Sequence, residues 1–266
     1  MKSSRISLHS LLLTSVALGF IGASQCKAGL ALFSNSTDTI SVAGGTSLGN
    51  SATFEASIFL TAAPVGPTSI FNEYTFGQED KSLGFDSNEL LGYGFPVSGS
   101  ALRNTVSLAL NTWHHVAFVY DGAQDRLYLD GSLVISRSST GSIGNASGNP
   151  FIGAISRTDG FPVSFQGYID TLRISDVARY SGASFLAPIG DLASDANTQL
   201  LYNFDEASGS TTVADLSGNG HTGTLGTGFS GATSPQFIAA VPEASVVAGL
   251  LGTCGLGMMV RRRRRV

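Results

Sequence analysis

The segment WHHVAFVYDGAQDRLYLDGSLVI, residues 113–135, decides the fold. Its first eight residues alternate between two sets of side chains, and a period of two is typical of a β-strand. Asp130-Gly131 stands between two short apolar runs, 127–129 and 133–135, and this dipeptide supplies the positive φ angles that a tight turn needs. The segment therefore predicts antiparallel strands, the last two of them joined as a β-hairpin.

Short runs of the same kind recur through residues 30–230, where we find no stretch of ten or more residues with the 3.6-residue apolar period of a helix. One helical turn is expected at 176–180. Many short strands without longer helices indicate an antiparallel sandwich. The other predicted strands are 53–60, 69–76, 90–95, 105–110, 151–155, 168–174 and 200–204.

Composition and charge narrow the class of protein. The chain has 266 residues, of which 42% are hydrophobic and 13% charged, so it is long enough for a substantial core and too weakly charged for a disordered polymer. Eight of the 15 basic residues lie at the two ends, which leaves 7 basic against 18 acidic residues between 29 and 240. An acidic body repels phosphate backbones, so nucleic acid is not an expected partner.

The N-terminus has the pattern of a secretory signal peptide over residues 1–28. Lys2 and Arg5 precede an apolar run, 11–23, and Cys26-Lys27-Ala28 then places small residues at positions −3 and −1 before residue 29. A lipoprotein signal at Cys26 is the alternative, although Gln25 stands where a small residue is needed. A retained membrane anchor is disfavoured because about 13 apolar residues are too few to span the hydrocarbon core.

The C-terminus contains Val241-Pro242-Glu243-Ala244, then the apolar stretch 246–260 and five arginines. It resembles the PEP-CTERM sorting signal of bacteria that make extracellular polysaccharide, with Ala244 in place of the usual second proline. The resemblance implies transient insertion of 246–260 in the inner membrane, cleavage by an exosortase-type enzyme, and export to the cell surface or extracellular space. The arginines independently predict a cytosolic end by the positive-inside rule. Both cysteines, Cys26 and Cys254, lie in these end segments, so the mature body contains no thiol.

Three motifs in the body are similar to those of laminin-G-like, concanavalin-A-like jelly rolls: residues 113–131, 167–180 and 200–223. The last of these commonly starts such domains, but here it comes at the end. The resemblance implies an all-β fold, an antiparallel two-sheet jelly-roll sandwich over 29–230, followed by a linker at 231–240 and the sorting signal at 241–266. It says less about ligands, because this fold carries lectins, hydrolases and inert spacers.

Catalytic patterns are weak in this sequence. The Glu-x-Asp-x-x-Glu strand of glucanases with this fold is missing, and Glu79-Asp80 and Asp205-Glu206 are expected to be solvated loop charges. Gly45-Thr46-Ser47-Leu48-Gly49 fits a serine-hydrolase pattern, but no helical segment follows Ser47. We therefore expect a protein that is not an enzyme.

The histidines of the predicted strand and the single tryptophan give no strong indication of a metal site or a sugar site. His114 and His115 are neighbours in one strand and point to opposite faces, so they cannot share a metal. Trp113, the only tryptophan, could stack on a sugar, but packing at the start of a strand is the preferred expectation.

Calcium is the strongest cofactor candidate. Asp215 and Asn219 lie in a glycine-rich loop, and hard oxygen ligands at flexible spacing suit Ca²⁺. In related jelly rolls the position of Asp170 often serves one structural calcium, so the resemblance implies that Asp170 joins them. The alternative is that Asp215 caps a turn without metal.

The expected function is therefore that of an exported surface or matrix protein that associates with carbohydrate, such as extracellular polysaccharide, without catalysis. A structural or adhesive protein with no small ligand is the first alternative, and a glycan-active enzyme the second.

Overall fold

The computed structural model describes residues 29–75, 78–87, 89–94, 101–106, 108–143, 150–153 and 165–239. The predicted signal peptide and the sorting signal, including Val241, Pro242 and Glu243, lie outside these residues. Within the described ranges no helix is long and apolar enough to cross a membrane.

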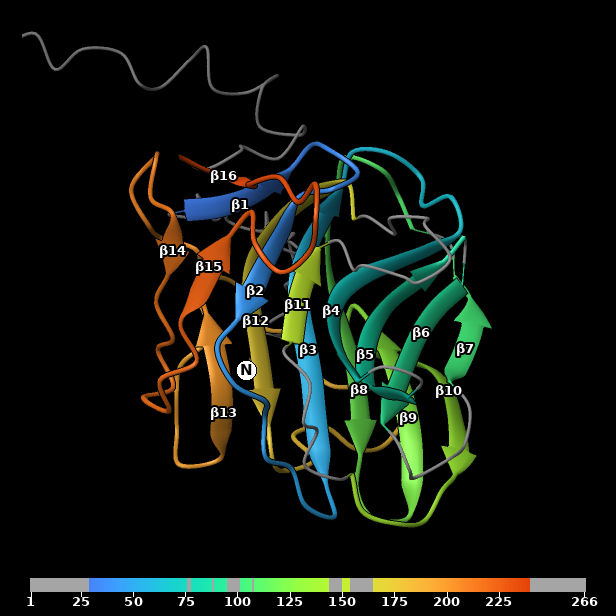
Figure 1. Ribbon diagram of the computed structural model, residues 1–266. Coiled ribbons are helices and arrows are strands. Elements are labelled where there is room, and N and C mark those ends of the chain that lie inside the picture. Colours follow the sequence, from blue (N-terminus) through green and yellow to red (C-terminus); the bar gives the residue numbers. More distant parts are fainter. Residues whose placement is uncertain are drawn as a thin grey trace, which may run out of the picture.

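The described chain forms two antiparallel sheets packed face to face, as a jelly-roll sandwich requires (Figure 1). Sheet I has the order β10-β9-β8-β3-β12-β1-β16, with β13 also paired to β12, and sheet II has the order β14-β15-β2-β11-β4-β5-β6-β7. Sheet I consists of β1 (Gly29–Phe33), β3 (Ala52–Leu60), β8 (Trp113–Tyr120), β9 (Gln124–Leu129), β10 (Ser132–Ser138), β12 (Gly167–Ser175), β13 (Thr198–Tyr202) and β16 (Gln236–Ala239). Sheet II consists of β2 (Thr39–Val42), β4 (Pro67–Thr75), β5 (Gln78–Asp86), β6 (Glu89–Gly94), β7 (Leu102–Thr105), β11 (Pro150–Gly153), β14 (Thr212–Val213) and β15 (Gly223–Leu225).

The predicted hairpin is confirmed as β9 and β10. Asp130 and Gly131 have φ angles of 50° and 76°, the left-handed pair that a two-residue turn of this kind uses. A Cβ atom on Gly131 would lie 2.1 Å from the carbonyl oxygen of Phe185, so the position excludes a side chain for steric reasons as well.

Three expectations about elements were wrong. Val106 and Leu108 pack against the core from a loop, so their alternation does not form the predicted strand 105–110, and β7 ends at Thr105. Glu79 and Asp80 belong to strand β5 and not to a loop. The expected turn of helix at 176–180 does not form, because the Thr53 hydroxyl donates to the Val177 carbonyl and accepts from the Arg179 amide.

The sandwich also extends past its expected end. Gln236–Ala239, within the expected linker 231–240, forms β16 and pairs with β1, where Gly29 faces Ala239. The buried ring of Phe237 explains this pairing, since it joins the core while Gln236 stays exposed. The first and last described strands therefore lie side by side (Figure 1).

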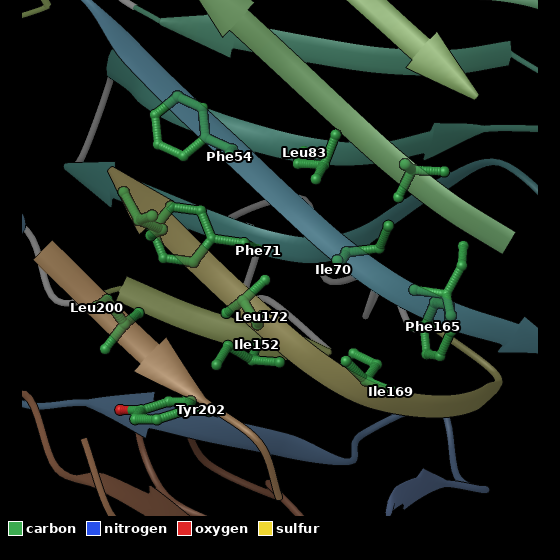
Figure 2. Packing of buried hydrophobic residues seen from close by; sticks show 14 of the residues in the cluster. Phe54, Ile70, Phe71, Leu83, Ile152, Phe165, Ile169, Leu172, Leu200 and Tyr202 are labelled. Atoms are coloured by element: carbon green, nitrogen blue, oxygen red, sulfur yellow. The ribbon is translucent and has the colours of Figure 1, made fainter. Parts of the chain in front are cut away.

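Apolar side chains from the two inner faces fill the space between the sheets. Figure 2 shows Phe54 of sheet I close to Phe71 of sheet II, and their ring centroids are 5.9 Å apart. Phe54 also stacks on Phe118 of β8 at 5.8 Å. Each of these rings is almost fully buried, which stabilises the fold by about 1.5–3 kcal/mol per side chain.

His114 closes the end of β8 next to the hairpin turn. Its two ring nitrogens lie 2.7 Å from the Asp130 carboxylate and 3.1 Å from the Ala109 carbonyl. Both partners are acceptors, so the protonated ring, with a hydrogen on each nitrogen, satisfies both of them. The hydrogen bond to Asp130 accordingly raises the pKa of His114 above 6.5, against the effect of burial.

Replacing Gly131 with Val should destabilise the protein by more than about 1 kcal/mol, because a β-branched residue resists positive φ. Gly209→Val is the matched control, since Gly209 has φ +88° but open space around its Cβ position. Urea unfolding should show the larger loss for Gly131→Val. Equal losses would mean that the Phe185 contact has no steric consequence.

The His114 imidazolium predicts a pH-dependent stability. A pKa raised on folding contributes stability that is fully present below the unfolded pKa, about 6.5, and is lost as pH rises through the higher folded pKa. The free energy of unfolding should therefore fall in the wild type as the pH rises from about 6.5 through the higher folded pKa, and this fall should be smaller in His114→Gln. Parallel pH curves for the two proteins would contradict a stabilising contact between protonated His114 and Asp130.

Candidate functional site

The predicted calcium loop is organised around Asp215. Its carboxylate accepts four hydrogen bonds, from the amides of Leu201 (3.2 Å), Ser217 (2.9 Å) and His221 (3.0 Å) and from the Ser217 hydroxyl (2.7 Å). Burial acts to raise the pKa of Asp215, but these donors outweigh it and lower the pKa. An ionised carboxylate has about four acceptor sites, and three donors of the loop and one of β13 fill them.

Asn219 lies in the same loop and points to β13. Its side-chain amide donates to the carbonyls of Thr198 (3.0 Å) and Gln199 (3.1 Å), so it pins the loop to the strand edge. Asp215 and Asn219 are thus brought together, in an arrangement that serves as a turn cap.

Asp170 occupies a different position. It is fully buried in β12, where the register with β3 shifts between Ile169 and Thr171. Arg173, three residues further along β12, faces Leu201, whose amide binds Asp215. Three residues along a strand span about 10 Å, so the register does not bring Asp170 next to the Asp215 loop. Among the described residues no cluster of three or more His, Cys, Asp or Glu side chains could hold a metal.

A row of aromatic side chains crosses the outer face of sheet I. The row consists of Trp113 on β8, Phe59 on β3 and Tyr168 on β12, which face one another in the register of the sheet. The Phe59 centroid lies 5.4 Å from that of Trp113 and 5.5 Å from that of Tyr168. Trp113 and Tyr168 are partly exposed on either side of Phe59, which is 5% exposed. The expected packing of Trp113 at a strand start is confirmed, and it leaves part of the ring accessible.

Polar groups border this aromatic row. Leu32 of β1 continues the register beyond Tyr168 and is followed by exposed Gln236 of β16. Exposed Gln166 precedes β12 and lines a cavity of about 110 Å³ at the same end of the sandwich. The other residues that line it are Leu60, Ala62, Ala63, Pro64, Val65, Pro67 and Thr68. Aromatic surface bordered by a few amides is the composition that small-molecule sites share.

The adjoining part of the outer face is closed by the chain between β12 and β13. Tyr180 and Phe185 of this segment stack at 3.6 Å, and His115 meets the edge of both rings. Beneath them Glu55 accepts from Arg173 (2.7 Å), His115 (3.0 Å) and the Tyr180 hydroxyl (2.6 Å).

This arrangement holds Glu55 as a buried carboxylate. Burial acts to raise the pKa of Glu55, but the hydrogen bond from His115 and the charge of Arg173 outweigh it and lower the pKa. Because Glu55 is fully buried under two aromatic rings, we assign the cluster a structural role. His114 and His115 contact different carboxylates on opposite faces, as the alternation predicted.

The aromatic row was missed from the sequence because its members come from strands that are distant in the chain. Phe59, Trp113 and Tyr168 each stand one residue from an inward-facing residue of a predicted strand, so outward orientation could be inferred for each alone. Their alignment depends on β3 lying between β8 and β12, and no local pattern specifies that order.

Residues 34–181 match the laminin G family model described as the concanavalin A-like lectin/glucanases superfamily. The chain belongs to this superfamily. The match covers β2 to β12, whereas β13 to β16 lie beyond it. None of the curated proteins compared with the sequence matches it.

Three solved structures are similar to this chain at low sequence identity. A candidate carbohydrate-binding protein from Bacteroides ovatus ATCC 8483 is 20% identical, with a TM-score of 0.64, over 83% of this chain and 62% of that one. The heptameric SAP-like pentraxin from Limulus polyphemus is 18% identical, with a TM-score of 0.46, over 58% and 78%. The CBM40 of Ruminococcus gnavus IT-sialidase, bound to α2,3 sialyllactose, is 16% identical, with a TM-score of 0.43, over 60% and 95%. The likeness to the Bacteroides ovatus protein agrees with the fold described above.

Calcium binding by the loop stays a prediction, and its geometry favours a cap that needs no metal. Asp215→Ala should then destabilise the protein by about 1–3 kcal/mol, because four donors lose their acceptor. A chelator should leave the wild-type melting temperature unchanged. A chelator-induced drop that disappears in both Asp215→Ala and Asp170→Ala would instead establish a shared calcium ion.

Proposed function

We propose that this protein binds neutral polysaccharide through the aromatic row, without catalysing a reaction on it. The observation that supports this most directly is the alignment of Trp113, Phe59 and Tyr168 on three neighbouring strands. The row spans two strand spacings, about 10 Å, which matches a disaccharide unit.

The chemistry of the row suits a sugar ring. The C–H groups of a pyranose face are apolar and pack on aromatic rings, while its hydroxyls need donors and acceptors at the rim. Gln166 and Gln236 carry exposed amides at that rim, and amides can both donate and accept. The body has 18 acidic against 7 basic residues between positions 29 and 240, so neutral chains are favoured over anionic ones.

The proposal includes export and the lack of catalysis. The signal-peptide pattern and the resemblance of residues 241–266 to a PEP-CTERM signal support export, membrane insertion of 246–260 and exosortase processing. The described carboxylates near the row are engaged in structural contacts, as Glu55 is with Arg173, which supports a binding role.

A second candidate function is adhesion without a small ligand. Leu186 and Ile189, in the segment that closes sheet I, are 92% and 70% exposed. Exposed apolar side chains of this kind are typical of contacts with another macromolecule.

Binding to immobilised xylan, β-glucan and galactomannan tests the proposal. We expect at least one of these polysaccharides to bind the wild type, and the double change Trp113→Ala and Tyr168→Ala to weaken binding by about tenfold or more, since about 1.4 kcal/mol is tenfold. Leu186→Ser is the control, and it should bind like the wild type.

Retention on no polysaccharide, or equal retention of the double variant, would contradict the proposal. Loss of binding in Leu186→Ser alone would favour adhesion through the chain segment between β12 and β13. Release of reducing ends would show a glycan-active enzyme.

A further inference from the structure

A lysine and a glutamate are buried together inside the sandwich, separate from the aromatic row. Glu73 of β4 and Lys81 of β5 face each other in register, and both side chains are 0% exposed. They lie on the inner face of sheet II, because Phe71 and Leu83, two residues away on each strand, belong to the core. The Lys81 Nζ atom is 3.1 Å from Oε2 of Glu73.

Thr46 completes this cluster from the loop between β2 and β3. Its hydroxyl donates to Oε2 of Glu73 at 2.8 Å and accepts from Nζ of Lys81 at 3.2 Å. Its carbonyl accepts a further bond from Lys81 at 2.5 Å. The other carboxylate oxygen of Glu73 is buried without a hydrogen-bond partner. Through its two hydrogen bonds, the Thr46 hydroxyl bridges Nζ of Lys81 and Oε2 of Glu73.

We propose that Lys81 and Glu73 condense to an intramolecular amide that links β4 to β5. The reaction joins a neutral amine to a neutral carboxylic acid. Nζ of Lys81 attacks Cδ of Glu73, the N–C bond forms, the bond from Cδ to Oε2 breaks, and one water molecule leaves. The nitrogen loses one proton and keeps one, and no oxidant or reductant is needed.

Burial prepares both groups for this step. A charged pair in the apolar interior costs free energy, so transfer of the proton from the lysine to the glutamate becomes easier than in water. Burial outweighs the attraction of Lys81 and raises the pKa of Glu73, which favours the acid form. Contact at 3.1 Å in a rigid sheet also replaces a bimolecular encounter with an intramolecular one.

Thr46 has a specific part in the reaction, as a positioning residue. Its hydroxyl can take the proton from Nζ and pass a proton to Oε2, the oxygen that leaves as water. Relays of this kind contribute about 10²–10⁴-fold to a rate. The product fixes adjacent strands covalently in a body whose sequence between residues 29 and 240 contains no cysteine.

Tryptic peptide mapping of the full chain, digested after denaturation, tests the proposal. Lys81 is the only basic residue between Lys27 and Arg103, so an unmodified chain yields one cut after position 81. The amide blocks that cut and leaves residues 28–103 as one peptide that is lighter by one water. The amide closes a ring over residues 73–81. Cleavage of a single backbone bond within this ring during fragmentation should therefore yield no separate fragment ions. We expect this peptide to be the main product from folded wild type.

Variants identify the chemistry. Lys81→Arg keeps the positive charge but has no amine that forms this amide, so cleavage after position 81 should return. Thr46→Val keeps the backbone carbonyl and should slow the appearance of the blocked peptide by about a hundredfold after refolding.

Complete cleavage after Lys81 in aged, folded wild type would overturn the proposal, whatever the variants do. Loss of water at another acidic residue would also overturn it. Unchanged kinetics in Thr46→Val would overturn the role of the hydroxyl in the reaction.

Discussion

The burial of β3 on both of its faces is the constraint on which the rest of the structure depends. All nine residues from Ala52 to Leu60 are buried, and β3 pairs with β8 on one side and β12 on the other. Its inner set, which includes Phe54, fills the core between the sheets. Glu55 and Phe59 point to the outer face of sheet I. Different parts of the protein bury these two side chains. If the outer face of β3 were solvated, positions 55 and 59 could both hold exposed polar residues.

The outer face of sheet I is consequently divided into two regions. Around Glu55 a buried charge is compensated by Arg173, His115 and the Tyr180 hydroxyl, and the chain between β12 and β13 closes over it. Removing one of these partners would leave a buried charge incompletely paired, which is costly in a protein interior. Around Phe59 the cover consists of two partly exposed rings, so this region combines a rigid base with accessible aromatic surface. Strand β3 thus contributes to both regions: the region around Glu55 stabilises the fold, and the region around Phe59 is the proposed binding surface.

Local patterns in the sequence predicted the elements whose side chains alternate strictly. The strands at 53–60 and 113–120 and the turn at Asp130-Gly131 needed only period two and the φ preference of glycine. Strand β5 was missed because Glu79, Asp80 and Lys81 interrupt its apolar pattern, although Lys81 proves to be buried. The sequence identified Asp215 and Asn219 of the loop. Their partners Leu201 and Thr198 come from β13, and a local sequence pattern does not predict these contacts. The order of β8, β3 and β12, which creates the aromatic row, is likewise a tertiary property.

Intrinsic fluorescence tests the central claim, that the aromatic row binds polysaccharide, most directly. Trp113 is the only tryptophan of the chain and lies at one end of the row, so its emission reports on this surface alone. Titration of the folded protein with soluble xylan, β-glucan or galactomannan should produce a saturable change in emission that Tyr168→Ala weakens. A polysaccharide that is retained by the protein yet leaves the Trp113 emission unchanged at saturation would place binding elsewhere and contradict the account.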